Sequence, residues 1–389
     1  MKNNKVHFST FVPERLKEAR EARGLTQEEL SAKIELSHQA ISKYEKNKAI
    51  PSTQVLEQLS TLLSVPTHFF LKPKETDISA DDVVFFRSRA AATKKSKLAH
   101  ANRLKWLIEI HRYLETYLDF PTLDIPKYLS SKVYAPIDFE EIDEIAIKVR
   151  KHWGLGNGPI SNVLLLLEKK GAIVARASFS DYKIDACSVW EPSSRPYIFL
   201  GSDKTAAHSR FDISHELGHL VLHSNLTLSE FNNKENYKRI EKEAHRFASA
   251  FLLPASSFGN EVMFTSIEHF AELKKRWKVS IQAMAYRARQ LGLISEFQHI
   301  NIRKRLAANH WLQQEPLDAE IPFEEPAALK QAVELIVQHN AQTKSAIEYE
   351  IGLESQEIEI LANLDAGYLF ESEQGNGKVL PFKLKNNHY

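Results

Sequence analysis

The sequence predicts an α+β protein that is mostly helical. Amphipathic stretches with capping residues at their starts fill both ends of the chain. Three short apolar runs between residues 171 and 200 have the composition of strands, and an apolar helix follows them directly. These patterns predict an N-terminal all-α domain, a basic helical linker, a domain with a small sheet, and a helical C-terminal region with a tail, over residues 1–72, 73–138, 139–300 and 301–389 respectively.

Composition excludes several classes of protein. The 389 residues carry a net charge of only +1, so attraction to nucleic acid must come from a local patch. The single cysteine, Cys187, rules out an internal disulfide framework and suits a reducing compartment. No segment approaches the roughly 18 apolar residues of a membrane span. We therefore expect a cytoplasmic protein with no membrane partner.

Residues 11–72 read as four short helices joined by tight turns. Thr26 to Glu29 form a capping box for the second helix, and Ser37 caps the third. Two helices of this length joined by three or four residues make a helix-turn-helix. With Leu25-Thr-Gln-Glu-Glu-Leu and Ile41-Ser-Lys-Tyr-Glu-Lys-Asn followed by Pro51-Ser, the stretch resembles an XRE-type DNA-binding domain.

That resemblance implies binding to a double-stranded DNA operator by a homodimer, with the third helix in the major groove. The implied contacts are a phosphate for Gln27, and base edges or phosphates for His38, Gln39, Ser42 and Lys43. The alternative is a protein–protein module without DNA affinity, because the domain is only mildly basic.

The predicted linker contains a stretch whose charged residues are all basic. No acidic residue occurs between Asp82 and Glu109, and residues 90–118 read as a helix with a leucine stripe. A solvated linker helix explains the charge, whereas an arm that tracks phosphates or forms a dimer explains why an apolar stripe is present. The sequence favours neither. Further on, Gly154, Gly156 and Gly158 form a turn rather than a phosphate loop, because no strand precedes them.

The helix after the strands, Ser209-Arg-Phe-Asp-Ile-Ser-His-Glu-Leu-Gly-His-Leu-Val-Leu-His223, contains an H-E-x-x-H motif. His215 and His219 lie one turn apart on one face, so both imidazoles can reach one metal ion. Glu216 is placed to accept a proton from a water molecule at that ion. Two imidazoles, an open coordination position and a carboxylate base are what a zinc peptidase requires.

A catalytic zinc takes a third protein ligand, which should lie downstream. The helix from Ile240 to Leu253 ends before Pro254 and places Glu241 and Glu243 on either side of its apolar stripe. Periodicity cannot choose between these two carboxylates, and it does not exclude His223 or His245.

The two motifs together resemble the ImmA/IrrE family of zinc metallopeptidases. The resemblance rests on Phe211-x-x-x-His-Glu-Leu-Gly-His-Leu-x-Leu-His and Glu243-Ala-x-x-Phe-Ala-x-x-Phe-Leu-Leu-Pro. It implies a zincin-like domain with Glu243 as the third ligand. It also implies a site-specific endopeptidase that cleaves a partner regulator or toxin-like protein, often encoded nearby, in response to stress or to phage and mobile-element signals. The alternative is a repressor whose metal site is sensory or vestigial.

Two features are left open. Peptide hydrolysis also needs a hydrogen-bond donor for the oxyanion, and the candidate side chains are Tyr182, Tyr197, His208 and His223. In the C-terminal region, residues 345–362 read as a helix pair with acidic faces, for which packing or dimerisation is favoured over groove binding. Residues 373–389 form a tail for which the sequence predicts no role.

Overall fold

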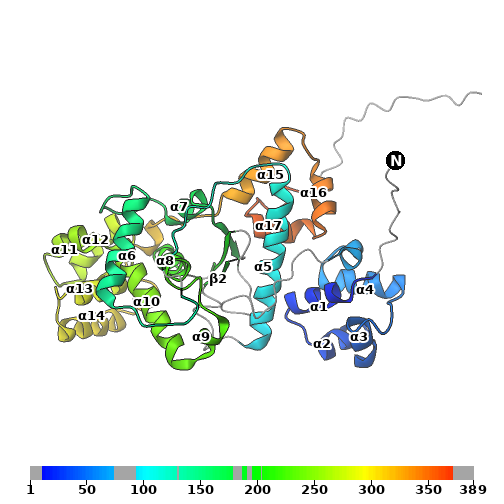
Figure 1. Ribbon diagram of the computed structural model, residues 1–389, viewed down its shortest axis with the longest axis horizontal. Coiled ribbons are helices and arrows are strands. Elements are labelled where there is room, and N and C mark those ends of the chain that lie inside the picture. Colours follow the sequence, from blue (N-terminus) through cyan, green and yellow to red (C-terminus); the bar gives the residue numbers. More distant parts are fainter. Residues whose placement is uncertain are drawn as a thin grey trace, which may run out of the picture.

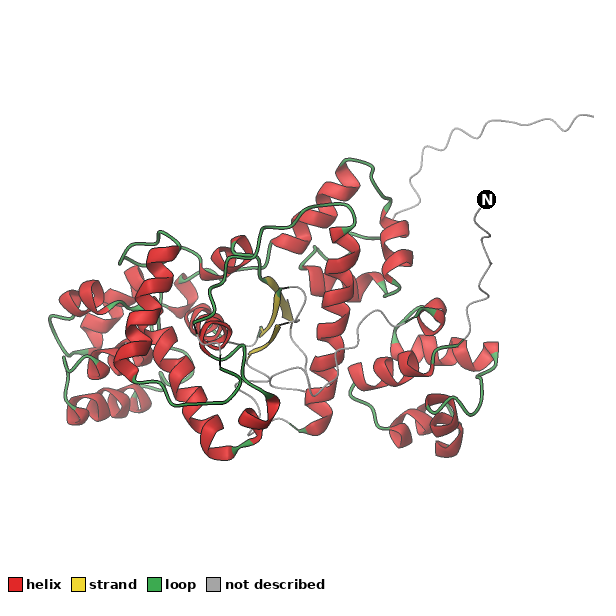
Figure 2. Cartoon of the chain, viewed as in Figure 1, coloured by secondary structure: helices red, strands yellow, loops and turns green. Residues whose placement is uncertain are grey.

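The computed structural model describes residues 11–73, 93–128, 131–177, 186–190, 195–202 and 204–370. They form an elongated molecule in which helices surround one small sheet (Figures 1 and 2). The mostly helical α+β class predicted from the sequence is confirmed. No helix of these ranges is long and apolar enough to span a bilayer.

The N-terminal helices begin where the capping residues predict. Thr26 and Glu29 make the reciprocal bonds of a capping box, and the hydroxyls of Ser37 and Ser52 each accept a bond from a backbone N–H three residues on. The elements are α1 (Pro13–Ala22), α2 (Gln27–Lys33), α3 (His38–Glu45), α4 (Thr53–Leu63) and the 3₁₀ turn η1 (Thr67–Leu71).

The sheet separates two hydrophobic cores. Its strands are β1 (Ile173–Ala177), β2 (Ala186–Trp190) and β3 (Pro196–Gly201), in the order β1-β3-β2, with β1 parallel and β2 antiparallel to β3. Successive side chains of a strand point to opposite faces. Tyr197 and Phe199 therefore join one core, and Ile198 and Leu200 join the other.

The face of Ile198 is covered by the helix that carries the H-E-x-x-H motif. This helix, α8 (Ala206–Leu222), packs against β2 and β3 on one side and against α10 (Lys234–Leu252) on the other (Figure 1). The surrounding elements are α6 (Phe139–His152), α7 (Val163–Lys169), α9 (Leu228–Asn232), α11 (Ala255–Glu261), α12 (Ile267–Trp277), α13 (Ile281–Gln290) and α14 (Glu296–Ala308).

The opposite face of the sheet is covered by part of residues 73–138, the range predicted to form a basic linker. The described part of that stretch contains one long helix, α5 (Lys94–Glu115), which is buried rather than solvated. Its apolar side chains, including Leu104 and Leu107, pack between the N-terminal helices and the sheet. The same core includes α15 (Ala328–Gln338), α16 (Lys344–Ile351) and α17 (Ser355–Ala362). The leucine stripe is thus satisfied within the chain and needs no second copy.

Buried ion pairs fasten the N-terminal helices to this core. The guanidinium of Arg15 contacts Glu18 at 2.8 Å and Glu109 of α5 at 2.9 Å, and the indole N–H of Trp106 donates to Glu18 at 2.7 Å. Removing one partner of such a buried group costs roughly 3–5 kcal/mol. The helix-turn-helix is therefore held against α5 by charged groups that resist separation.

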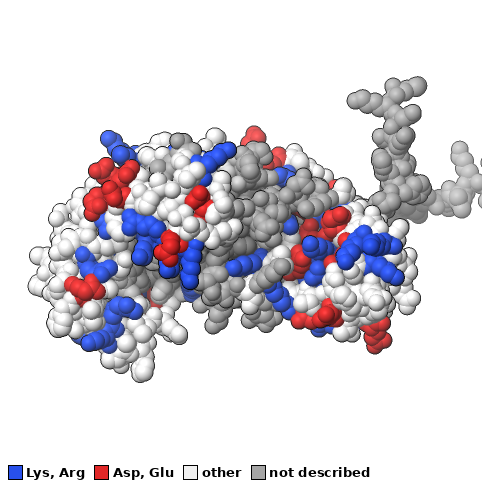
Figure 3. Space-filling model, turned by 60° about the horizontal axis from the view of Figure 1, so that its bottom comes forward, with Lys and Arg blue, Asp and Glu red and all other residues white. Residues whose placement is uncertain are grey.

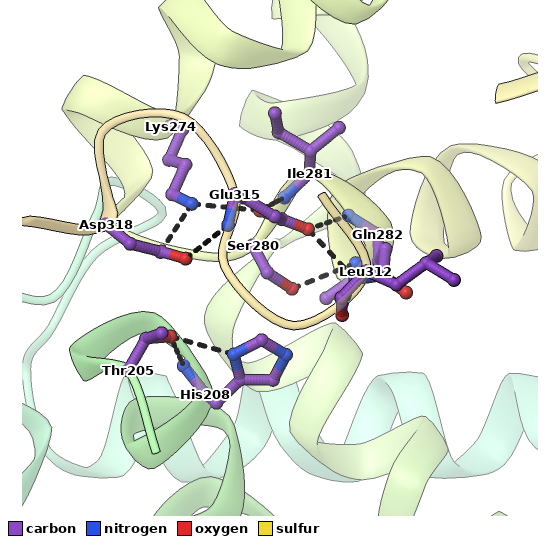
Figure 4. A network of polar contacts seen from close by, with 10 residues as sticks. Thr205, His208, Lys274, Ser280, Ile281, Gln282, Leu312, Glu315 and Asp318 are labelled. Atoms are coloured by element: carbon purple, nitrogen blue, oxygen red, sulfur yellow. Dashed lines mark hydrogen bonds and ion pairs between the residues drawn. The ribbon is translucent and has the colours of Figure 1, made fainter. Parts of the chain in front are cut away.

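A second buried cation holds the segment after α14 against α12 and α13 (Figure 4). The ammonium of Lys274 contacts Glu315 at 2.9 Å and Asp318 at 2.6 Å, all three side chains being almost wholly buried. Glu315 also accepts the backbone N–H groups of Ile281 and Gln282 at the start of α13. Residues of the predicted C-terminal region therefore complete the packing of the preceding domain.

Candidate metal centre

The motif helix places two imidazoles together in the interior. His215 and His219 are fully buried on α8, and their Nε2 atoms lie 3.0 Å apart. Burial lowers the pKa of His219 well below its usual value, although Glu241 opposes this shift. The neutral imidazole that results is the form that binds a metal.

Gly218 lets α10 approach this pair closely. A Cβ atom on Gly218 would lie 3.1 Å from the carbonyl oxygen of Ala244 and 3.2 Å from the Cβ of Phe247. Any larger residue would push the two helices apart by some tenths of an ångström. The glycine inside the motif is thus required for the distance between α8 and α10.

That close approach brings one carboxylate of α10 to the imidazoles. The Glu241 oxygens lie 3.5 Å from Nε2 of His215 and 3.5 Å from Nε2 of His219. Burial raises the pKa of Glu241, but its contacts with both imidazoles outweigh this effect and lower the pKa to about 2. The three side chains therefore supply two imidazole nitrogens and an ionised carboxylate.

The prediction that Glu243 is the third ligand is not supported by the structure. Successive residues of a helix are turned by about 100°, so residues 241 and 243 point in directions roughly 200° apart and only one can face the histidine pair. Glu243 instead accepts bonds at Oε1 from the Tyr134 hydroxyl, the Ile137 N–H and Arg239, and its Oε2 contacts His223.

The three donor groups fit a zinc ion. Bonds of about 2.0–2.1 Å in tetrahedral geometry place ligand atoms about 3.3 Å apart. The separations of 3.0 to 3.5 Å among His215, His219 and Glu241 are close to that value, and all their donor atoms lie within 4.8 Å of one another. The side chain of Glu241 keeps 20% of its surface exposed, so solvent reaches the centre from its side.

Glu216 is directed at the sheet. Its side chain is fully buried, and its Oε2 accepts a bond of 2.6 Å from the hydroxyl of Ser188 in β2. Ser188 was missed in the sequence analysis. The feature that could have identified it is a hydroxyl side chain within the apolar strand Ala-Cys-Ser-Val-Trp. Strand alternation directs Ser188 toward α8, whereas Cys187 and Val189 face the other core.

The residues considered as oxyanion donors lie in different places. Tyr197 is on the far face of the sheet, where its hydroxyl contacts His111 of α5 at 3.0 Å. His208 bonds to Thr205 in the first turn of α8, beside the Lys274 network (Figure 4). His223 contacts His219 and Glu243. Tyr182 lies outside the described residues, so none of the described three is placed by a contact as that donor.

The residues predicted to contact DNA share one surface only in part. His38, Gln39 and Lys43 are exposed on α3, which packs beside α2 among the N-terminal helices (Figure 1). Ser42 is half-buried, and the amide of Gln27 donates to Glu45 at 2.6 Å. On the face shown in Figure 3, basic and acidic side chains are interspersed, as the small net charge predicts.

Comparisons with known proteins agree with both halves of this description. Residues 16–70 match the helix-turn-helix family model, and residues 167–289 match the model of the IrrE N-terminal-like domain, a peptidase family. The chain is 34% identical over 71 residues to the SPbeta prophage-derived uncharacterized HTH-type transcriptional regulator YonR of Bacillus subtilis (strain 168), a match that covers 18% of this chain and 66% of YonR. It is 39% identical over 70 residues to the HTH-type transcriptional regulator ImmR of the same organism, which covers 16% of this chain and 55% of ImmR. The chain thus spans somewhat more than half of each relative.

Proposed function

Because this chain joins an XRE-type helix-turn-helix domain to an IrrE-like peptidase-family domain, we propose that it is a DNA-binding regulator with zinc endopeptidase activity. The observation that carries the proposal is the convergence of His215, His219 and Glu241, with the buried carboxylate of Glu216 on the same helix next to His215. A structural metal site has no use for such a carboxylate, whereas hydrolysis needs a base.

In this proposal His215, His219 and Glu241 hold the ion. When bound, zinc supplies Lewis-acid chemistry, since it lowers the pKa of water and polarises a peptide carbonyl. Glu216 accepts the proton of the attacking water and returns it to the leaving amine. The bond from Ser188 holds one oxygen of Glu216 in place for that transfer. General base catalysis of this kind typically contributes about 10²- to 10⁴-fold.

The sheet offers a place for an extended substrate. Among the described strands β2 is at an edge, and it carries the hydroxyl that contacts Glu216. A peptide can add to such an edge through main-chain hydrogen bonds. We take the substrate to be a partner regulator or toxin-like protein, cleaved in response to stress or to a phage or mobile-element signal. The names of the relatives, one of them prophage-derived, support this choice.

Replacing Glu216 by Gln tests the peptidase. The variant keeps the shape and the three ligands but loses the base, so zinc content should remain at one per chain while cleavage stops. New protein N-termini should be compared in strains that carry wild type, Glu216→Gln, or the matched control Glu144→Gln, whose carboxylate is 71% exposed on α6. Cleavage sites present with wild type and the control but absent with Glu216→Gln are expected. Identical sets of N-termini in all three strains, under a condition in which the regulator responds, would favour a repressor with a sensory or vestigial metal site.

DNA binding is tested separately. The proposal is that α3 of two copies reads a palindromic operator, with Gln39, His38 and Lys43 on the exposed side. Affinity should fall steeply with salt because phosphate contacts release counterions. Gln39→Ala should relax sequence preference, whereas Gln27→Ala should weaken binding to all sequences alike. Absence of any salt-sensitive shift of its own promoter DNA would favour the protein–protein module.

A further inference from the structure

A line of buried side chains runs from the metal centre into the protein. His219 directs Nε2 at His215 and Glu241, and its Nδ1 lies 3.1 Å from Nδ1 of His223. The other nitrogen of His223, Nε2, lies 3.1 Å from Oε2 of Glu243. His219, His223 and Glu243 are each at most 1% exposed.

Glu243 can only accept hydrogen bonds here. Its Oε1 already receives the Tyr134 hydroxyl at 2.8 Å, the Ile137 N–H at 3.0 Å and Arg239 at 3.1 Å. One of these three donors is the cationic guanidinium of Arg239, which forms an ion pair with Glu243 as a carboxylate. An ionised carboxylate has no proton to donate, so the hydrogen of the remaining contact must sit on Nε2 of His223.

The hydrogen on Nε2 of His223 determines which nitrogen of His219 carries a hydrogen. A neutral imidazole carries one N–H and one lone pair. With its hydrogen on Nε2, His223 presents a lone pair at Nδ1, so Nδ1 of His219 must be the donor. His219 then carries its own lone pair on Nε2, the atom that faces His215 and Glu241.

We propose that His223 and Glu243 are positioning residues that hold His219 in the Nδ1–H tautomer, with its Nε2 lone pair directed at the metal centre. The proposal rests on the metal site of the proposed function and deepens it. Metal-binding histidines usually donate their second N–H to a carboxylate or carbonyl, which fixes ring and tautomer. Here that carboxylate acts through an intervening histidine.

The two histidines of the metal centre differ in the hydrogen-bond partners of their Nδ1 atoms. Within the described residues, Nδ1 of His215 has no hydrogen-bond partner. Nδ1 of His219 is engaged and leads to a carboxylate with four donors. This line of hydrogen bonds also gives Glu243 a role. The role explains why Glu243 is completely buried although it does not contact His215 or His219.

Glu243→Gln reverses the line of hydrogen bonds. The three donors at Oε1 keep the amide carbonyl there, so the amide NH₂ meets Nε2 of His223 and moves the histidine's hydrogen to Nδ1. His219 must then accept at Nδ1 and carry its hydrogen on Nε2, where the metal binds. Loss of such outer partners typically weakens metal affinity by about 10- to 100-fold. Tyr134→Phe is the matched control, because it removes one donor of Oε1 and leaves Oε2 with His223.

The experiment measures zinc affinity of the full chain by chelator competition for wild type, Glu243→Gln and Tyr134→Phe. A 10- to 100-fold loss in Glu243→Gln alone supports the proposal. Equal affinities of wild type and Glu243→Gln, or an equal loss in both variants, overturn it. Thermal unfolding of each variant identifies any that fails to fold.

The tautomers are read independently in the wild type by ¹⁵N–¹H correlation spectra of histidine-labelled, metal-free protein. Nε2–H on His223 together with Nδ1–H on His219 is the expected result, and the opposite pair of tautomers refutes the proposal. Because this readout needs neither metal nor substrate, it separates the two ideas. Wild type that binds no zinc would defeat the proposed function while the spectra still decide the tautomers.

Discussion

Removal of Glu241 is the sharpest test of the metal centre, because the structure and the motif resemblance choose different carboxylates. Glu241→Ala deletes the group whose oxygens lie 3.5 Å from Nε2 of both histidines. Glu243→Ala deletes a carboxylate that contacts His223 instead. If Glu241 is the ligand, the first variant loses a direct bond to the ion and the second loses only an orienting partner.

The expected size of the effect follows from the number of ligands. Structural zinc sites with four protein ligands bind with about 10–16 kcal/mol, or roughly 3 kcal/mol for each ligand. At 1.4 kcal/mol per factor of ten, Glu241→Ala should weaken zinc binding about 100-fold or more. The side chain is 20% exposed, so its removal should open a solvent-accessible gap rather than a sealed cavity.

Rescue by a small carboxylate separates the two variants better than affinity alone. Acetate can enter the gap left by Glu241→Ala and supply the missing oxygen ligand, so zinc affinity should rise with acetate concentration. The site of Glu243 is closed, its side chain being 0% exposed, and acetate should leave Glu243→Ala unchanged. Zinc competition titrations with and without acetate measure both. Wild-type affinity in Glu241→Ala, with acetate rescue of Glu243→Ala, would falsify the assignment made from the structure.

Three further predictions concern packing and charge. Lys274→Met leaves two buried carboxylates without their cation, so the free energy of unfolding in urea should fall by about 3–5 kcal/mol; a change near zero would show that the carboxylates take up protons or water instead. Gly218→Ala should weaken zinc binding without unfolding the protein, because the new Cβ would lie 3.1 Å from the Ala244 carbonyl and push α10 away; unchanged affinity in calorimetry would mean that α10 is not held at its closest approach. Burial raises the pKa of Glu168 from 4.5 to about 7 against two backbone hydrogen bonds. A raised carboxyl pKa means that this group's stabilising contribution is complete below pH 4.5 and is lost as pH rises to about 7. Glu168→Gln should therefore gain stability relative to wild type as pH rises between those limits. A difference in unfolding free energy that stays constant across this range would contradict the argument.

The helices were predictable from the sequence because their signals are local. Thr26, Ser37 and Thr205 each accept a backbone bond at the start of a helix, as side chains of this type do. The H-E-x-x-H spacing likewise fixes the relation of His215 and His219, since both lie on one helix with a known repeat. Local rules therefore determined the elements and two of the proposed ligands.

The role of residues 90–118 was not predictable in the same way. The leucine stripe of α5 showed that a partner was required, whereas the basic charge fitted a solvated linker helix, and the sequence favoured neither interpretation. Its partners are α1, β3 and the C-terminal helices α15, α16 and α17, and the sequences of these elements carry no mark of that pairing. Apolar surfaces attract one another without directional preference, so the partner is fixed only when the whole chain is packed.

The sequence by itself predicted the type of centre: two imidazoles and a base on one helix, with a third ligand downstream that the family resemblance takes to be a carboxylate. Only the tertiary structure shows which carboxylate lies beside the two imidazoles, namely Glu241. Glu241 and Glu243 flank the apolar stripe of α10 similarly, and the choice depends on how α10 is rotated and how closely it crosses α8 at Gly218. That rotation is set by side chains distant in the sequence, such as Tyr134 and His223, which hold Glu243 on the other side. Helix periodicity gives the angles of side chains around the axis of one helix. A metal site built from two helices also depends on how the axes of α8 and α10 are placed and rotated relative to each other.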